Sequence, residues 1–337
     1  MITKPDFNLK EFNTLGINAR AKYCTQIENE EDLEILFNEG KIDEKTLVIG
    51  EASNILFNSD FDGLVLIITT RGINIYSETQ KEIILDIKSG ENWNNLVDYT
   101  VKNKYWGIEN LSMIPGKVGA APIQNIGAYG TELKDVFVSL EAFDTQTGKI
   151  EKFTKEECEF DYRDSIFKSK YKGRYIILSI KLKLSKTPKP NISYKALKDY
   201  FRENDEKTLS IENIQQAVNE VRSSKLPDPK EIKNSGSFFK NPIIDNTKAK
   251  ELKRKYPDIP LYKVGNDSTK VAAGWLIEKA GWKGKRFGDA GVHKKQALVL
   301  VNYGNASGEE ILQLSQKIAT DILNKFGIKL EREVWVI

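Results

Sequence analysis

The hydrophobic and polar positions of the chain predict six helices. In each, apolar residues recur every three or four positions, so that they share one helix face. The clearest case follows the capping-box sequence Ser307-Gly-Glu-Glu310 and ends at Gly327, a residue suited to a helix C-terminus. The predicted helices span residues 30–39, 93–102, 194–201, 210–224, 272–280 and 307–326.

Segments rich in β-branched and aromatic residues lie between these helices and predict strands. A strand over 328–337 would place Val334 on one face and Glu333 on the other. The other predicted strands are 46–49, 64–69, 82–88, 136–143, 149–153, 175–184 and the end of 293–302. Because strands dominate the middle of the chain, the pattern predicts an α+β fold.

Composition is that of a soluble globular protein with two or three domains. The 337 residues are 40% hydrophobic and 29% charged, and no apolar run is long enough to span a bilayer. The opening residues 1–6 lack the basic and apolar segments of a signal peptide. We therefore expect a cytoplasmic protein without membrane insertion.

Charge and cysteine content narrow the function classes. The formal net charge of +3 comes with dispersed lysines, which argues against a nucleic-acid partner. It suits an enzyme that handles anionic small molecules. Cys24 and Cys158 lie far apart and match no metal or redox spacing, so we expect two free buried thiols and no metal site.

One long glycine-rich stretch, 107–129, is the strongest candidate for chemistry. Glycines allow positive φ and a close approach of backbone to a ligand, and successive N–H groups can form an anion-binding concavity. The stretch has few charges and many small residues, so it predicts a pyrophosphate cradle, although an arbitrary glycine-rich stretch is more often a structural loop. Its punctuating and polar residues are Gly107, Ser112, Pro115, Gly116, Gly119, Asn125 and Gly127.

A second stretch has the same character. An apolar strand is followed by a small polar turn from Gly50 to Asn54 and another apolar run. Alone this pattern is typical of many hairpins. Together, the two stretches resemble the phosphate-contacting loops of flavoproteins with the p-cresol methylhydroxylase or vanillyl-alcohol oxidase type of FAD domain. The chain has neither a P-loop nor a Gly-x-Gly-x-x-Gly fingerprint.

Three further residues are candidates for catalysis. Arg163 lies among aromatic residues and two aspartates, where it could form a surface ion pair or meet a carboxylate with two hydrogen bonds. Ser237 follows small residues in a turn, and Glu333 lies near the C-terminus. A Ser-His-Asp hydrolase is rejected, because the single histidine, His293, belongs to no nucleophile motif.

Six segments in the same order resemble the UDP-N-acetylenolpyruvoylglucosamine reductase family. This resemblance covers the chain from about residue 13 to its end. The segments are Asn13-Thr-Leu-Gly-Ile, Gly50-Glu-Ala-Ser-Asn-Ile-Leu-Phe, Ile114-Pro-Gly-Lys-Val-Gly-Ala-Ala-Pro-Ile-Gln-Asn-Ile-Gly-Ala-Tyr-Gly, Tyr162-Arg-Asp-Ser-Ile-Phe-Lys, Gly236-Ser-Phe-Phe-Lys-Asn-Pro and Leu330-Glu-Arg-Glu-Val. Ser193-Tyr-Lys-Ala-Leu197 resembles the tyrosine-bearing loop of the longer subclass, and Ala52 stands where the family often has a third glycine.

The resemblance implies an architecture and an activity. Residues 1–70 and 71–222 would form two FAD-binding subdomains, 223–327 a substrate-binding domain, and 328–337 a strand that returns to the active site. NADPH would reduce non-covalent FAD and leave. The enolpyruvyl sugar nucleotide would then receive hydride from flavin N5 at its methylene carbon and a proton at the neighbouring carbon. The protein is expected to act as a monomer.

The resemblance also assigns roles to residues. Arg163 and Glu333 would stabilise the enolate-like intermediate, and Ser237 would protonate carbon. Contacts with the substrate fall to Tyr194, Lys225, Asn241 and Gln296. Contacts with FAD fall to Gly50, Ser53, Asn54, Ser112, Pro115, Gly116, Gly119, Asn125, Gly127, Ala128 and Tyr129.

Two other functions are alternatives to the reductase activity that the resemblance implies. An oxidase of the same flavin superfamily would often tether its flavin through a loop histidine, and neither glycine stretch contains one. A non-catalytic flavin-binding module would not need Arg163, Ser237 and Glu333 together. The oxidase stays open as the alternative.

Overall fold

The computed structural model describes residues 1–203 and 208–337, and it confirms the predicted α+β class. Contacts divide the chain into two compact units. Unit 1 comprises residues 1–7, 21–51 and 62–224, and unit 2 comprises residues 8–20, 52–61 and 225–337. The turn from Gly50 to Asn54 crosses this division, because Gly50 belongs to unit 1 and Asn54 to unit 2.

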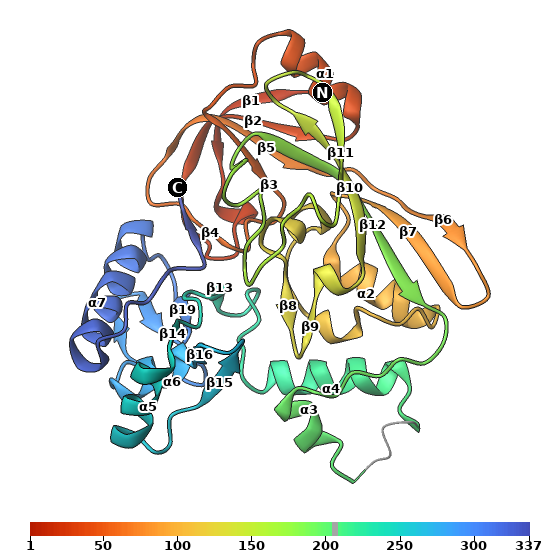
Figure 1. The fold of residues 1–337 in the computed structure, drawn as a ribbon. Helices are drawn as coiled ribbons and strands as arrows, with labels where there is room; N and C mark the ends of the chain where they lie inside the picture. Colours follow the sequence, from red (N-terminus) through yellow and green to blue (C-terminus); the bar gives the residue numbers. More distant parts are fainter. Residues whose placement is uncertain (204–207) are drawn as a thin grey trace. The chain divides into compact units, whose positions relative to one another are not determined.

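The first sheet of unit 1 carries the N-terminal helix. Helix α1 (Glu30–Asn38) begins at a capping box of Asn29 and Asp32 and buries Leu33 and Leu36 in a core shared with this sheet (Figure 1). Strand β3 pairs with β5 in parallel. The strand order is β1 (Thr3–Asn8), β2 (Arg20–Ile27), β5 (Phe61–Ile68) and β3 (Thr46–Ile49).

The second sheet of unit 1 is antiparallel and contains the longest strand. Its order is β11 (Ile150–Thr154), β10 (Phe137–Asp144), β12 (Tyr175–Ser185), β7 (Glu82–Lys88) and β6 (Ile73–Glu78). Helices α2 (Trp93–Lys102) and α4 (Ile211–Ser223) contribute apolar faces to the core of this sheet. The short helix α3 (Lys195–Tyr200) lies against α4 (Figure 1).

Short elements build the loop that connects α2 to β10. The long glycine stretch folds into single 3-10 turns and enters a small hairpin of β8 and β9. These elements are η2 (Glu109–Leu111), η3 (Val118–Ala120), η4 (Pro122–Gln124), β8 (Gly127–Ala128), β9 (Thr131–Glu132) and η5 (Leu133–Asp135). The candidate cradle is therefore an ordered, compact loop.

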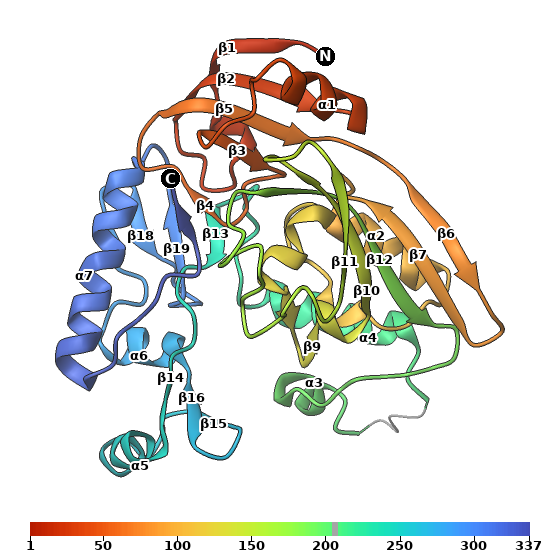
Figure 2. The same cartoon turned by 45° about the horizontal axis from the view of Figure 1, so that its top comes forward.

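Unit 2 contains two sheets of three or four strands, a short pair of strands near the C-terminus, and three α-helices. One sheet has the order β13 (Lys233–Ser237), β19 (Val299–Asn302), β18 (Ala290–Val292) and β17 (Arg286–Phe287). The other has the order β14 (Ile243–Asp245), β16 (Ser268–Val271) and β15 (Leu261–Val264). The remaining elements are η1 (Lys10–Phe12), α5 (Asn246–Lys255), α6 (Ala273–Lys279) and α7 (Gly308–Phe326). Helix α7 runs beside β18 and β19 (Figure 2).

Helix α7 confirms its predicted ends. Ser307 and Glu310 form the capping box, and Gly327 ends the helix in the left-handed conformation with φ +65°. The other predicted helices are confirmed to within two residues at each end.

The predicted strand over 328–337 is wrong in its extent. Only β20 (Trp335–Val336) is a strand, and it pairs in parallel with β4 (Ile55–Leu56). Residues 331–333 instead bond to the chain after β13, where the Lys240 N–H donates to the Glu331 carbonyl. The period of two in the sequence reflected alternate burial, which an extended segment can have without continuous pairing.

The start of α7 offers a stability test. A Cβ added at Gly308 would overlap the carbonyl oxygen of Phe57, also in unit 2. We expect Gly308→Ala to destabilise the protein by about 1–3 kcal/mol, because the backbone at Phe57 cannot move as a side chain does. Thermal unfolding measures the effect, with Lys317→Ala on the exposed side of α7 as the control. Equal melting temperatures for the two variants would contradict this packing.

Candidate functional site

Backbone hydrogen bonds hold the long glycine loop of unit 1 against the residues that precede α2. The N–H groups of Val118 and Gly119 donate to the carbonyls of Glu91 and Ser89 at 2.9 and 2.8 Å. A Cβ at Gly119 would lie 2.5 Å from the Cβ of Ser89. Gly119 is therefore required for close packing against the residues before α2, and Gly116 takes a positive φ of +125°.

Strained backbone gathers in the candidate stretches. Eight described non-glycine residues have positive φ, and five of them lie in segments that the sequence had singled out. These five are Ala52, Met113, Asn125, Tyr129 and Arg163. Such strain costs about 1–3 kcal/mol a residue and tends to cluster at ligand-binding sites. Ala52, with φ +40°, occupies a conformation that glycine adopts more easily, which explains the physical advantage of glycine there.

Gly50 and the long glycine loop lie against each other within unit 1. The stem of Lys117 packs over Gly50, where an added Cβ would lie 2.6 Å from the Lys117 Cγ. In unit 2, the Asn54 side chain donates to the Glu333 carbonyl at 3.2 Å. The turn from Gly50 to Asn54 is thus joined by a hydrogen bond to a predicted catalytic residue.

Several polar groups of the loop are buried. The Asn125 amide donates to Glu132 and to the Asp161 carbonyl at 3.0 and 3.1 Å, so any contact of Asn125 with a cofactor would come from its backbone. Ser112 is also buried, whereas the Oδ1 atom of buried Asn110 has no hydrogen-bond partner. Compact glycine turns, strained backbone and an unpaired buried acceptor fit a loop that binds a polar ligand such as FAD.

Arg163 is fixed by the loop it approaches. Its guanidinium donates to the Gly127 carbonyl at 2.7 Å and lies 5.6 Å from the centre of the Tyr162 ring. An added Cβ at Gly127 would lie 3.1 Å from the Arg163 Nη1, so glycine makes room for this arginine. The Lys168 ammonium also donates to the Arg163 carbonyl. The side chain is therefore held at the β8 hairpin.

A second arginine and two tyrosines extend this cluster within unit 1. The Arg222 guanidinium lies 5.9 Å from the ring centre of Tyr129, which in turn meets Tyr194 edge-on at 5.2 Å. Burial lowers the pKa of Arg222; the Tyr129 phenol opposes this, and the charge of Arg163 adds to it. Two cations that repel one another favour an anion beside them. Tyr194 is exposed, and we predict a contact with substrate there.

Ser237 and Glu333 occupy neighbouring backbone positions in unit 2. The Glu333 N–H donates to the carbonyl of Phe238, the residue after Ser237, at 2.9 Å. Phe238 and Phe239 are fully buried and anchor the end of β13, while Ser237 and Glu333 are both partly exposed. Gly236, with φ +70°, permits the irregular turn before Ser237.

The predicted substrate residues of unit 2 lie in two places. Asn241 accepts from the Ala273 N–H at 2.9 Å, and a Cβ at Gly274 would lie 3.0 Å from the Gln296 Oε1. Both amides thus lie at the start of α6. Lys225 is exposed just after α4.

Comparisons with known proteins identify the family. The model of the "UDP-N-acetylenolpyruvoylglucosamine reductase, C-terminal domain" matches residues 228–337, and that of an "FAD binding domain" matches residues 22–154. The chain is 46% identical to a UDP-N-acetylenolpyruvoylglucosamine reductase of Flavobacterium johnsoniae, with 100% of both chains covered. It is 48% identical to the reductase of Amoebophilus asiaticus, over 98% of this chain and 97% of the relative. The chain belongs to the UDP-N-acetylenolpyruvoylglucosamine reductase family.

The fold agrees with a solved member of this reductase family. The crystal structure from Thermus caldophilus superposes with a TM-score of 0.69 at 22% identity, and covers 99% of this chain and 98% of that one. The two-lobed FAD-binding fold of the p-cresol methylhydroxylase type with a C-terminal α+β domain, as predicted from the sequence, is confirmed.

The sequence analysis missed three residues that the structure brings into the candidate site. Glu51 accepts a hydrogen bond from the long glycine loop, Asn110 is buried with an unpaired side-chain oxygen, and Arg222 lies over the ring of Tyr129. Glu51 and Asn110 lie inside the two glycine stretches, and the carboxylate of Glu51 and the amide of Asn110 could have marked them as candidates. Arg222 had no comparable signal, since it reads as a polar position of α4.

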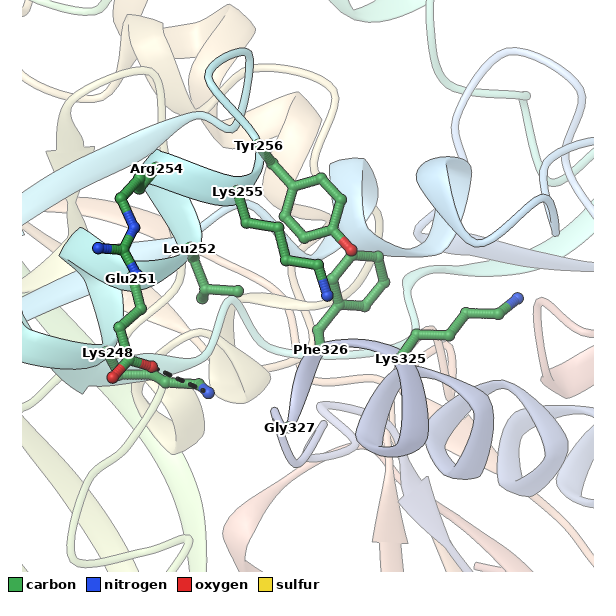
Figure 3. Close-up of a pocket in the computed structure, with 9 residues that line it drawn as sticks. All are labelled: Lys248, Glu251, Leu252, Arg254, Lys255, Tyr256, Lys325, Phe326 and Gly327. Carbon is green, nitrogen blue, oxygen red and sulfur yellow. Dashed lines mark ion pairs between the residues drawn. The ribbon is translucent and has the colours of Figure 1, made fainter.

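A cavity elsewhere in unit 2 contains none of the predicted site residues. It has a volume of about 620 Å³ and lies between α5 and the end of α7 (Figure 3). Lys248, Lys255 and Lys325 surround a floor formed partly by Tyr256 and Phe326. Lys255 and Lys325 lie in the last turns of α5 and α7, where basic residues complement the helix dipole.

Three features of residues 1–203 and 208–337 concern metals, thiols and membranes. No cluster of three or more His, Cys, Asp or Glu side chains could hold a metal ion. Cys24 and Cys158 are buried free thiols, as predicted. No described helix combines the length and apolarity needed to cross a bilayer.

Proposed function

We propose that this protein reduces UDP-N-acetylglucosamine enolpyruvate to UDP-N-acetylmuramate with electrons from NADPH, a step in the synthesis of peptidoglycan precursors. The observation that supports this most is the identity of 46–48% with named reductases over nearly the whole of both chains. These relatives favour the reductase over an oxidase of the same flavin superfamily.

FAD when bound would carry hydride from NADPH to the enolpyruvyl methylene carbon. The match of residues 22–154 to an FAD-binding domain supports this cofactor. We assign its contacts to the two glycine turns and the β8 hairpin. The assigned residues are Gly50, Ser53, Asn54, Ser112, Pro115, Gly116, Gly119, Asn125, Gly127, Ala128 and Tyr129.

The chain's own residues would stabilise charge and deliver a proton. Arg163 would bind the substrate carboxylate, on which negative charge develops, and Glu333 would share a proton or hydrogen bond with it. Ser237 would donate a proton to carbon as the general acid. The strained, fixed position of Arg163 and the adjoining backbones of Ser237 and Glu333 support these roles.

The nucleotide part of the substrate would be bound by other residues. Lys225 suits a diphosphate, and the amides of Asn241 and Gln296 suit oriented polar groups. Tyr194 would contribute its phenol, as in the tyrosine-loop subclass. Its segment is tied to the β8 hairpin, because the Asn191 side chain donates to the Gly130 carbonyl at 3.0 Å.

The proposed domains follow the family pattern. Residues 1–70 and 71–222 would bind FAD, 223–327 would bind substrate, and 328–337 would return to the active site. The family-model matches at 22–154 and 228–337 support a division in the region after α4. We also propose that the protein acts as a monomer in the cytoplasm.

One experiment tests the function. The purified protein should show the visible absorption bands of a flavin. It should oxidise NADPH beyond the one equivalent that reduces its flavin only when UDP-N-acetylglucosamine enolpyruvate is added. UDP-N-acetylmuramate should accumulate in equal amount by mass spectrometry. A protein that gains no flavin bands when FAD is supplied would refute the proposal, and substrate-independent oxidation of NADPH by O₂ would favour an oxidase.

We predict that FAD is bound without a covalent link. Neither glycine stretch contains a histidine or cysteine that could tether it. Precipitation with acid should therefore release all the yellow colour into the supernatant. Colour that remains with the washed precipitate would contradict this prediction.

A further inference from the structure

Glu51 connects the two glycine stretches of the candidate cofactor site. Its Oε2 accepts from the Gly116 N–H at 3.1 Å, and its Oε1 accepts from the Asn92 side chain at 2.9 Å. The Lys117 ammonium lies 3.6 Å from the same carboxylate. The Glu51 side chain thus joins the turn after β3 to the long glycine loop and to the start of α2, all within unit 1.

The groups that Glu51 contacts are themselves fixed. Asn92 caps α2 by accepting from the Asn95 N–H at 3.1 Å. The Gly116 carbonyl accepts from the Trp93 N–H at 3.0 Å, so both polar groups of Gly116 are held. Since Lys117 also packs over Gly50, the two stretches are interlocked by a carboxylate and by an apolar stem.

The charge of Glu51 makes its position informative. A carboxylate close to a diphosphate would oppose binding, and the repulsion is stronger inside a protein than in water. Any benefit to the cofactor must therefore come from the hydrogen bonds that order flexible, glycine-rich backbone before the ligand arrives. The ammonium of Lys117 offsets the negative charge.

We propose that Glu51 is a positioning residue that preorganises both loops for FAD. This inference rests on the proposed function, because it takes FAD as the ligand of these loops. Nothing in the role requires contact between Glu51 and the cofactor.

FAD titration of the flavin-free protein tests the proposal. Glu51→Ala is expected to raise the FAD dissociation constant tenfold or more, because both hydrogen bonds are lost. Glu51→Gln keeps an acceptor for one bond and should show a smaller increase. Glu34→Ala, at an exposed position of α1, is the matched control and should bind like the wild type.

Amide hydrogen exchange supplies a readout that does not depend on activity. In flavin-free Glu51→Ala, the amide of Gly116 should exchange faster, while those of β12 should not. If Glu51→Ala fails to fold, Glu51→Gln and Lys117→Met carry the test. Lys117→Met keeps a stem over Gly50 but leaves the carboxylate unbalanced, so it should weaken FAD binding severalfold, most strongly at low salt.

The possible outcomes are distinct. An unchanged dissociation constant in both Glu51 variants would overturn the proposal, and tighter binding would show that the carboxylate competes with the diphosphate. Wild-type protein that binds no FAD would instead count against the proposed function. Weakened binding with faster exchange at Gly116 would support the preorganising role.

Discussion

Arg163→Ala is expected to slow the reoxidation of the reduced protein by the enolpyruvyl substrate by about 10²-fold or more, the size of effect seen when one donor to a developing oxyanion is removed. Negative charge spreads into the substrate carboxylate when hydride arrives. A guanidinium already held in place by the Gly127 carbonyl at 2.7 Å would meet this carboxylate without much further ordering. Stopped-flow absorbance of the flavin measures this half-reaction separately from its reduction by NADPH.

Two controls separate this role from a structural one. FAD retention should stay near that of the wild type in Arg163→Ala, although the contact with Gly127 is lost. Arg163→Lys should recover only part of the rate, because an ammonium cannot make a planar two-point contact. Arg254→Ala, at an exposed position of α5, should change neither half-reaction. An unfolded variant or an unchanged reoxidation rate would favour the surface ion-pair interpretation.

Local chemistry explains which parts of the fold the sequence could predict. The ends of α7 depend on capping residues a few positions away, Ser307 and Gly327, and the structure confirms both. The helix predicted over 93–102 is confirmed as α2, and it buries Leu96 and Val101 on one face. Such signals lie within one or two turns of helix, so tertiary context was not needed to read them.

Long-range pairing explains most of what was missed. Strand β6 exposes Ile75 and Tyr76, so its burial does not alternate and gave no signal. The edge strand β1 and its neighbour β2 were likewise overlooked, since every position of β1 and half of those of β2 are exposed or partly exposed. Near the C-terminus, the pairing of β20 with β4 joins residues about 280 positions apart, and no local pattern encodes that register.

The candidate site likewise contains residues that the sequence could predict and residues that it could not. Gly50, Gly116 and Gly119 were identifiable because close packing or positive φ demands glycine, and the structure gives each of them such a reason. Glu51 and Arg222 were not, because their significance depends on contacts with Gly116 and Tyr129 that only the folded chain creates. Residue type alone marks a glycine's constraint more clearly than a charged residue's partner.

Ser237→Ala is expected to separate the two half-reactions. Reduction of the flavin by NADPH transfers hydride and needs no acid at carbon, so its rate should stay close to that of the wild type. Reduction of the enolpyruvyl group needs a proton at carbon, and its rate should fall by about 10²–10⁴-fold, the usual contribution of a general acid. Ser237→Cys keeps a proton donor and should recover part of the loss.

Strand β13 offers a matched control for this variant. Ser235 lies two residues earlier, is buried, and has a hydroxyl without a hydrogen-bond partner. Ser235→Ala therefore removes the same atom from the same strand and should leave both rates near those of the wild type. Equal slowing of both half-reactions in Ser237→Ala would mean that Ser237 shapes the site. The backbone contact of Phe238 with Glu333 would survive the Ser237→Ala substitution, because it does not involve the serine side chain. If neither half-reaction slowed, the proton would therefore have to come from water or from another donor.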